Sequence, residues 1–281
     1  MTYDNIKLFA SNCYNLCFGP TPVDFYEKIP PDLIISNICP YLNLHELGQA
    51  RSLSRSWNVL ASEPILWKAA IYREFAFSSK NWAQLDADLV KDVDMRQEML
   101  LLPDNIAEEL RRSALYGKSI KETHVLVMMP KGLTINKLGE LAKKFFAGNG
   151  YKYICPEVVE NLGDKPADES VWLLMTITNV VDGTKGESYI EQQNIIAELA
   201  KKALVPYEVP TTLDAATCIL AEYFRSKRRL FNNIPGTFTC TRGQKNAVHP
   251  IGCFGKDGLI ILSNNPNCGY GVAALRKINA S

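Results

Sequence analysis

The sequence lacks the features that mark several common classes of protein. None of its apolar runs approaches the ~18 residues that a membrane-spanning helix needs. Lys and Arg number 31 and Asp and Glu 30, so the formal net charge of +1 offers no basic excess for nucleic acid or an anionic membrane. Residues 1–20 contain no continuous apolar stretch, so we expect no secretory signal peptide. We therefore expect no nucleic-acid partner, no membrane partner and a cytoplasmic location.

Paired cysteines and internal repeats are also missing. The 8 cysteines are scattered through 281 residues without any Cys-x-x-Cys spacing, so free thiols are expected. Zinc ligands could be imagined among four residues of the C-terminal part, but the spacing argues against a site. These four are Cys240, His249, Cys253 and Cys268. We expect no metal, no cofactor and no catalytic residues.

One enzymatic alternative stays open at this point. His124 precedes an apparent strand and Cys155 follows a short Tyr-Ile pair. A Cys–His nucleophilic pair requires contact in space, which a sequence does not show. The alternative hypothesis is therefore an enzyme whose C-terminal α/β domain uses Cys/His chemistry and is fused to a helical interaction module.

Helical signals dominate residues 25–80, which follow a tail at residues 1–24. Ile35, Ile38 and Leu42 form one apolar stripe at helical spacing. Asn43 is a good N-cap residue for a second helix, and Pro64 opens a further helix. We predict a compact helical domain in this part, with no strand in residues 25–77.

Strand and helix signals alternate from residue 81 to 281. The apolar runs 123–129 and 171–178 predict two interior strands, because a strand buried on both faces is apolar throughout. Amphipathic or capped stretches predict helices at 134–147, 190–203 and 212–225. Shorter strands are expected at 238–241, 259–262 and 272–275. The predicted fold class is α+β, with an all-helical N-terminal bundle followed by an α/β domain with a mixed sheet.

A set of spaced anchors in the helical part resembles the F-box. The pattern opens with Ile29-Pro30 and ends with Leu53-Ser54-Arg55-Ser56-Trp57, and the family's Leu-Pro start is replaced by Ile-Pro. The resemblance implies docking on the adaptor subunit of SCF-type cullin–RING ubiquitin ligases, with the remaining chain recruiting a target protein. The implied partner-binding residues are Ile29, Pro30, Leu33, Ile38, Leu42, Leu53 and Trp57.

Two features of the C-terminal part bear on its partner. Its segments at 125–130, 207–210 and 271–276 are similar in general pattern to the C-terminal domains of F-box-like proteins of chlamydia-related bacteria that live in amoebae. That resemblance implies a host-directed effector in the host cytoplasm. A dense basic cluster ends one predicted helix and could bind an acidic partner, although cations also favour a helix C-terminus. The cluster comprises Arg225, Lys227, Arg228 and Arg229.

Overall fold

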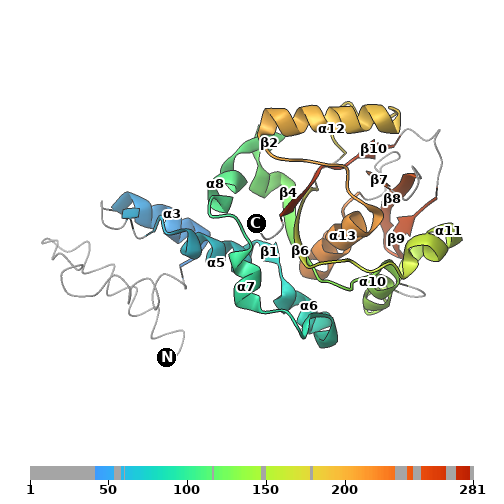
Figure 1. The fold of residues 1–281 in the computed structure, drawn as a ribbon, viewed down its shortest axis with the longest axis horizontal. Coiled ribbons are helices and arrows are strands. Elements are labelled where there is room, and N and C mark those ends of the chain that lie inside the picture. The colour runs from blue at the N-terminus through green and yellow to red at the C-terminus, as the bar shows by residue number, and fades with distance from the viewer. Residues whose placement is uncertain are drawn as a thin grey trace, which may run out of the picture. The chain divides into compact units, whose positions relative to one another are not determined.

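The structure is a computed structural model of the chain, and it separates into two compact units, Met1–Ala70 and Ile71–Ser281. It describes residues 42–53, 58–59, 61–115, 117–146, 150–177, 180–231, 239–242, 248–263 and 270–278. Helices and mixed sheets make up the fold, with helical structure in the N-terminal part and mixed α/β structure after it (Figure 1).

The described residues of the first unit form helices joined by turns and irregular segments. Helix α3 spans Leu44–Leu53, and α5 spans Pro64–Glu74, so that its last turn belongs to the second unit. The backbone N–H of Asn43 donates to the Glu46 carboxylate and the Glu46 N–H donates to the Asn43 side chain, a reciprocal cap at the start of α3. Both helices confirm the sequence predictions, including the starts at Asn43 and Pro64.

The second unit contains two mixed sheets. The first has the order β1-β4-β6-β11, with β1 parallel to β4 and the other neighbours antiparallel. Its strands are β1 (Ala76–Phe77), β4 (His124–Met129), β6 (Val171–Thr176) and β11 (Leu275–Ile278). The second has the order β10-β7-β8-β9-β5. Its strands are β5 (Tyr151–Ile154), β7 (Thr239–Arg242), β8 (Val248–Gly255), β9 (Gly258–Ile261) and β10 (Gly271–Val272).

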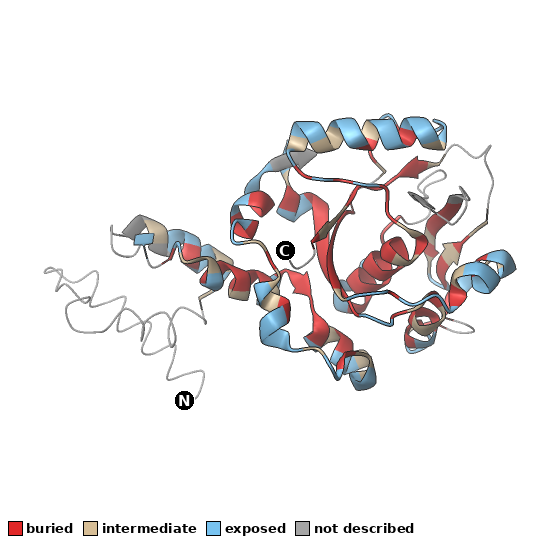
Figure 2. Cartoon of the chain, viewed as in Figure 1, coloured by how far each residue is buried: buried red, intermediate tan, exposed pale blue. Residues whose placement is uncertain are grey.

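Helix α13 (Thr212–Ser226) is the centre of this unit, because it packs against both sheets (Figure 1). It contacts β1, β4 and β6 of the first sheet and β7 and β8 of the second. Twelve of its 15 residues are buried, as a helix enclosed on all sides requires. Figure 2 shows the contrast with α12 (Tyr189–Ala203), which is buried at Gln192 and Ile196 and exposed along most of its surface.

The first sheet is covered on both faces, which explains the continuous apolar runs of β4 and β6. Val125, Val127 and Met129 belong to the core cluster that includes α13. Leu126 and Met128 alternate with them and are also buried, on the opposite face. The prediction that these two strands are interior is confirmed, since each pairs with two neighbours.

The remaining helices are short. They are α6 (Ser79–Leu85), η3 (Ala87–Val90), α7 (Met95–Leu100), α8 (Ile106–Arg111), α9 (Ile120–Thr123), α10 (Ile135–Ala142), α11 (Pro156–Val158) and the π-helical turn η4 (Val159–Gly163). A two-stranded ribbon, β2 (Ser113–Leu115) with β3 (Lys118–Ser119), precedes α9. Nowhere in the described ranges is a helix long and apolar enough to cross a membrane.

A buried glutamate joins three of these helices. Glu98 of α7 accepts hydrogen bonds from the Ser79 N–H (3.0 Å), from the Ser79 hydroxyl and from the Tyr72 hydroxyl (2.9 Å). The Trp172 indole N–H donates to the backbone carbonyl of Glu98 at 2.9 Å. Glu98 is 2% exposed, and burial raises the pKa of its carboxyl group. The network joins the last turn of α5 to α6 and α7 and, through Trp172, to β6.

Several sequence predictions are wrong in detail. Residues 76–77 form β1, so the span 25–77 is not free of strand. The expected single mixed sheet is two mixed sheets. The stretch 272–275, expected as one strand, contributes to β10 of one sheet and to β11 of the other. Helix α10 ends at Ala142 rather than at residue 147.

Candidate functional site

Most of the expected docking residues are in parts of the chain that the structure does not describe. Ile29, Pro30, Leu33, Ile38 and Trp57 lie outside the described residues. Leu42 precedes α3 and is half-buried, and Leu53 is the last residue of that helix.

The described part of the first unit has its own small core. Leu47 of α3 is fully buried, and the Trp67 indole N–H of α5 donates to the Ala61 carbonyl at 2.6 Å. Two apolar side chains, Val59 and Ile65, remain exposed.

The basic cluster forms the C-terminal end of α13 and the residues after it. Arg225 donates to the backbone carbonyl of Phe75 and pairs with Glu222 at 2.5 Å. The Lys227 ammonium lies 4.0 Å from the centroid of the Phe145 ring. Arg228 and Arg229 are exposed, and Arg229 lies over the Tyr223 ring at 5.7 Å. All four residues of the cluster are exposed, and Arg225 is the one with an ion pair to a neighbouring carboxylate.

His124 and Cys155 do not contact each other. A hydrogen bond of 2.9 Å joins His124 Nε2 to the Tyr207 hydroxyl, and another of 2.9 Å joins His124 Nδ1 to the Thr123 hydroxyl. The Cys155 thiol and the Ser263 hydroxyl are hydrogen-bonded at 3.0 Å, and the ability of the hydroxyl to donate to the thiolate lowers the pKa of the thiol. The particular Cys–His pair named from the sequence is not formed.

The imagined zinc ligands are not gathered either, as far as the structure describes them. His249 is buried in β8 and Cys253 lies half-buried in the same strand. Cys268 and the side chain of Cys240 lie outside the described residues. Nowhere among the described residues do three or more His, Cys, Asp or Glu side chains come together as a metal site would require.

Burial of His124 makes the fold sensitive to acid. Desolvation lowers the pKa of His124 to about 4, below its ordinary value of 6.5. The folded state therefore holds His124 neutral, and the unfolded state takes up a proton first as the pH falls. Stability from this group is present above pH 6.5 and is lost as the pH falls to about 4, by about 3 kcal/mol at most.

We expect the His124→Gln variant to be less stable than the parent at pH 7 but to lose less stability between pH 6.5 and 4. Urea unfolding midpoints at several pH values measure this difference. His45→Gln, an exposed histidine of α3, is the matched control and should keep the parental slope. If the stability of His124→Gln fell between pH 6.5 and 4 as steeply as that of the parent, the acid sensitivity would not come from His124.

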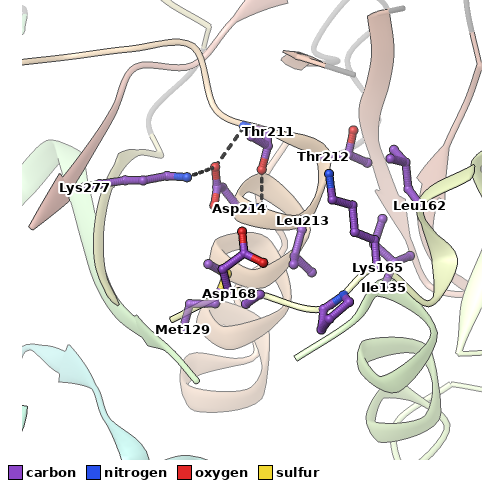
Figure 3. A pocket seen from close by; sticks show the side chains of 12 residues that line it. Met129, Ile135, Leu162, Lys165, Asp168, Thr211, Thr212, Leu213, Asp214 and Lys277 are labelled. Atoms are coloured by element: carbon purple, nitrogen blue, oxygen red, sulfur yellow. Dashed lines mark hydrogen bonds and ion pairs between the residues drawn. The ribbon is translucent and has the colours of Figure 1, made fainter. Parts of the chain in front are cut away.

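A pocket of about 290 Å³ opens at the start of α13 (Figure 3). It lies beyond the carboxyl ends of β4 and β11. The pocket is lined by Met129, Ile135, Leu162, Lys165, Pro166, Ala167, Asp168, Thr211, Thr212, Leu213, Asp214 and Lys277.

The first turn of α13 is held by a reciprocal cap at the pocket wall. The Asp214 N–H donates to the Thr211 hydroxyl at 3.2 Å, and the Thr211 N–H donates to the Asp214 carboxylate at 3.0 Å. Lys277 of β11 pairs with the same carboxylate at 3.0 Å (Figure 3). Asp214 is 1% exposed, so its charge is neutralised inside the protein by Lys277.

Sequence reasoning did not identify this pocket. The Thr-x-x-Asp spacing of Thr211 and Asp214 signals a helix start, but it does not point to a cavity. The lining comes from four separate parts of the chain: β4 with the start of α10, the loop before β6, the start of α13, and β11. Their convergence depends on the sheet topology.

Comparison with known proteins identifies one part of the chain. Residues 27–73 match a family model described as F-box-like. No curated protein and no solved structure matches the chain. The chain therefore carries an F-box-like domain at residues 27–73, and this domain supports a role in docking on the adaptor subunit of SCF-type ubiquitin ligases. F-box domains are typically modules of substrate recognition rather than catalysts.

Proposed function

We propose that the protein is a substrate-recruiting subunit of an SCF-type ubiquitin ligase. The observation that carries the proposal is the F-box-like match at residues 27–73. The first unit would bind the adaptor subunit of the ligase, and the second unit would bind a target protein and hold it for ubiquitin transfer. The protein would act in the cytoplasm and perform no chemistry of its own.

The test is direct binding to the purified adaptor. The full chain immobilised on a surface should retain the adaptor subunit, and the adaptor should then bring the cullin scaffold onto the same surface. Failure of the adaptor to bind the folded chain would end the proposal.

We propose further that Arg228 and Arg229 contact an acidic segment of the target. Both residues are exposed, and neither forms an ion pair with the described residues, whereas Arg225 pairs with Glu222 and Lys227 lies over the Phe145 ring. The double variant Arg228→Glu with Arg229→Glu should lose binding to a polyglutamate peptide while keeping adaptor binding. If this variant binds polyglutamate as well as the parent does, Arg228 and Arg229 do not contact the acidic segment.

An origin as a bacterial effector acting in a host cell is a further part of the proposal. It rests on the general similarity of segments 125–130, 207–210 and 271–276 to effector-like F-box proteins. A translocation assay, with a reporter enzyme fused to the chain in an infecting bacterium, tests it. A reporter signal confined to the bacterium would exclude this part and leave adaptor docking unaffected.

A further inference from the structure

The pocket at the start of α13 combines an apolar floor with a rigid, charged loop. The floor is formed by Met129, Ile135, Leu162 and Leu213. The loop before β6 is fixed to the segment after β4 by two backbone hydrogen bonds of 2.9 Å, from Gly132 N–H to the Ala167 carbonyl and from Ala167 N–H to the Leu133 carbonyl. The loop therefore presents its side chains in a defined place.

Two opposite charges on this loop remain unused by the fold. Lys277 and Asp214 neutralise each other. Lys165 and Asp168 are both exposed and line the same pocket, and within the described residues neither side chain has an ion pair or hydrogen bond. Figure 3 shows both side chains directed from the loop toward the first turn of α13. The pocket thus offers one free ammonium, one free carboxylate and an apolar surface beside them.

These three features restrict the ligand. A zwitterionic ligand pairs with both loop charges, whereas a singly charged ligand pairs with one of them and an uncharged apolar ligand with neither. A volume of about 290 Å³ is at the lower end of the ~300–1,000 Å³ range of ligand sites, so it excludes nucleotide-sized cofactors. The match is a small zwitterion with an apolar side chain.

We propose that this pocket binds a free amino acid with an aliphatic side chain. Its carboxylate pairs with Lys165, its ammonium pairs with Asp168, and its side chain lies on the floor beside Leu213. The proposal goes beyond adaptor docking and target recruitment and does not depend on either. It gives the second unit a small-molecule ligand in addition to any protein target.

Titration calorimetry of the full chain with three related ligands tests the proposal. L-leucine carries both charges, N-acetyl-L-leucine carries only the carboxylate, and L-leucinamide carries only the ammonium. Leucine should bind saturably, and each analogue should bind at least tenfold more weakly. Lys165→Gln should weaken leucine but not leucinamide, and Asp168→Asn should weaken leucine but not N-acetyl-leucine.

The controls separate the pocket from general charge effects. Lys185→Gln with Glu187→Gln removes one charge of each sign from an exposed loop outside the pocket and should leave leucine binding unchanged. Thermal unfolding of Lys165→Gln and Asp168→Asn is to be measured as well. Both variants should stay folded, because residues 165 and 168 are exposed.

Absence of saturable leucine binding up to ~10 mM, a limit far above typical ligand affinities, would overturn the proposal. Equal affinity for leucine and leucinamide would overturn it too and would indicate a site for a protein N-terminus. Equal affinity for leucine and N-acetyl-leucine would likewise indicate a site for a protein C-terminus. Because adaptor binding is measured separately, failure here leaves the proposed function untouched.

Discussion

The double variant Pro30→Ala with Leu42→Ala is expected to lose adaptor binding while the chain stays folded. In an F-box, the opening proline and the apolar residues of the first helix insert into a groove of the adaptor. Truncating an anchor of this kind typically costs ~2 kcal/mol of binding free energy. Two such anchors together contribute ~4 kcal/mol. Losing only half of that binding free energy weakens binding ~30-fold, because each 1.4 kcal/mol changes the dissociation constant tenfold.

Binding and folding have to be measured on the same preparations. Calorimetric titration with the adaptor gives the dissociation constant, and thermal unfolding gives the stability of the variant. A control with Lys121→Ala and Lys185→Ala, two exposed residues of the second unit, carries the same number of substitutions. Parental affinity in a folded Pro30→Ala, Leu42→Ala variant would show that the adaptor uses another surface.

Removal of the Glu98 carboxylate is expected to have the largest effect on stability. Glu98→Ala leaves the buried Ser79 N–H without its acceptor and deprives the Tyr72 hydroxyl of a partner. An unsatisfied buried donor costs about 1–3 kcal/mol, and the lost side chain leaves a void as well. We expect a loss of about 3 kcal/mol, which lowers the Tm of a unit of this size by ~6–12 °C.

Glu98→Gln separates the charge from the hydrogen bonds. Burial raises the pKa of Glu98 in the folded state above its unfolded value of 4.5, so the charged carboxylate reduces stability above that pH. Glutamine keeps the shape and an acceptor without the charge. The stability of Glu98→Gln relative to the parent should therefore be higher at pH 7 than at pH 4.

Urea unfolding midpoints of the parent and the two Glu98 variants at pH 4 and pH 7 measure these differences in stability. Glu108→Ala on α8, an exposed position, is the control and should change stability by no more than ~0.5 kcal/mol. If Glu98→Ala proved as mild as Glu108→Ala, the hydrogen bonds of Glu98 would not stabilise the second unit.

The sequence predicted elements whose signals are local. Helix α12 was expected at 190–203 and lies at Tyr189–Ala203, and α13 was expected at 212–225 and lies at Thr212–Ser226, because periodicity and capping mark their ends. Strands β4 and β6 were predicted as interior because their residues are apolar on both faces.

The missed elements have misleading local signals. Residues 78–94 are polar and span the boundary expected at residue 80, yet Ser78 caps α6 and Asp94 caps α7 by accepting hydrogen bonds from the Arg96 and Gln97 N–H groups. Strand β8 contains Pro250 and Gly252, which interrupt the strand pattern. Its register is irregular between Gly252 and Gly255, the kind of place where a sheet accepts such residues.

The two candidate sites also differ in whether the sequence could predict them. The docking segment is a continuous sequence pattern and could be predicted from the sequence, although most of its anchors lie outside the described residues. The pocket could not be predicted, because Lys165 and Lys277 are more than a hundred positions apart and meet only through the order of the strands.

The way the chain passes from β10 to β11 has a consequence for synthesis. Only Ala273 and Ala274 separate these two strands, yet β10 completes the edge of one sheet and β11 completes the edge of the other. Both strands follow the other described strands along the chain, so β6 and β7 each keep an unpaired edge until residues 271–278 have been synthesised. Unpaired edges are templates for aggregation, so the nascent second unit is most vulnerable just before residues 271–278 emerge.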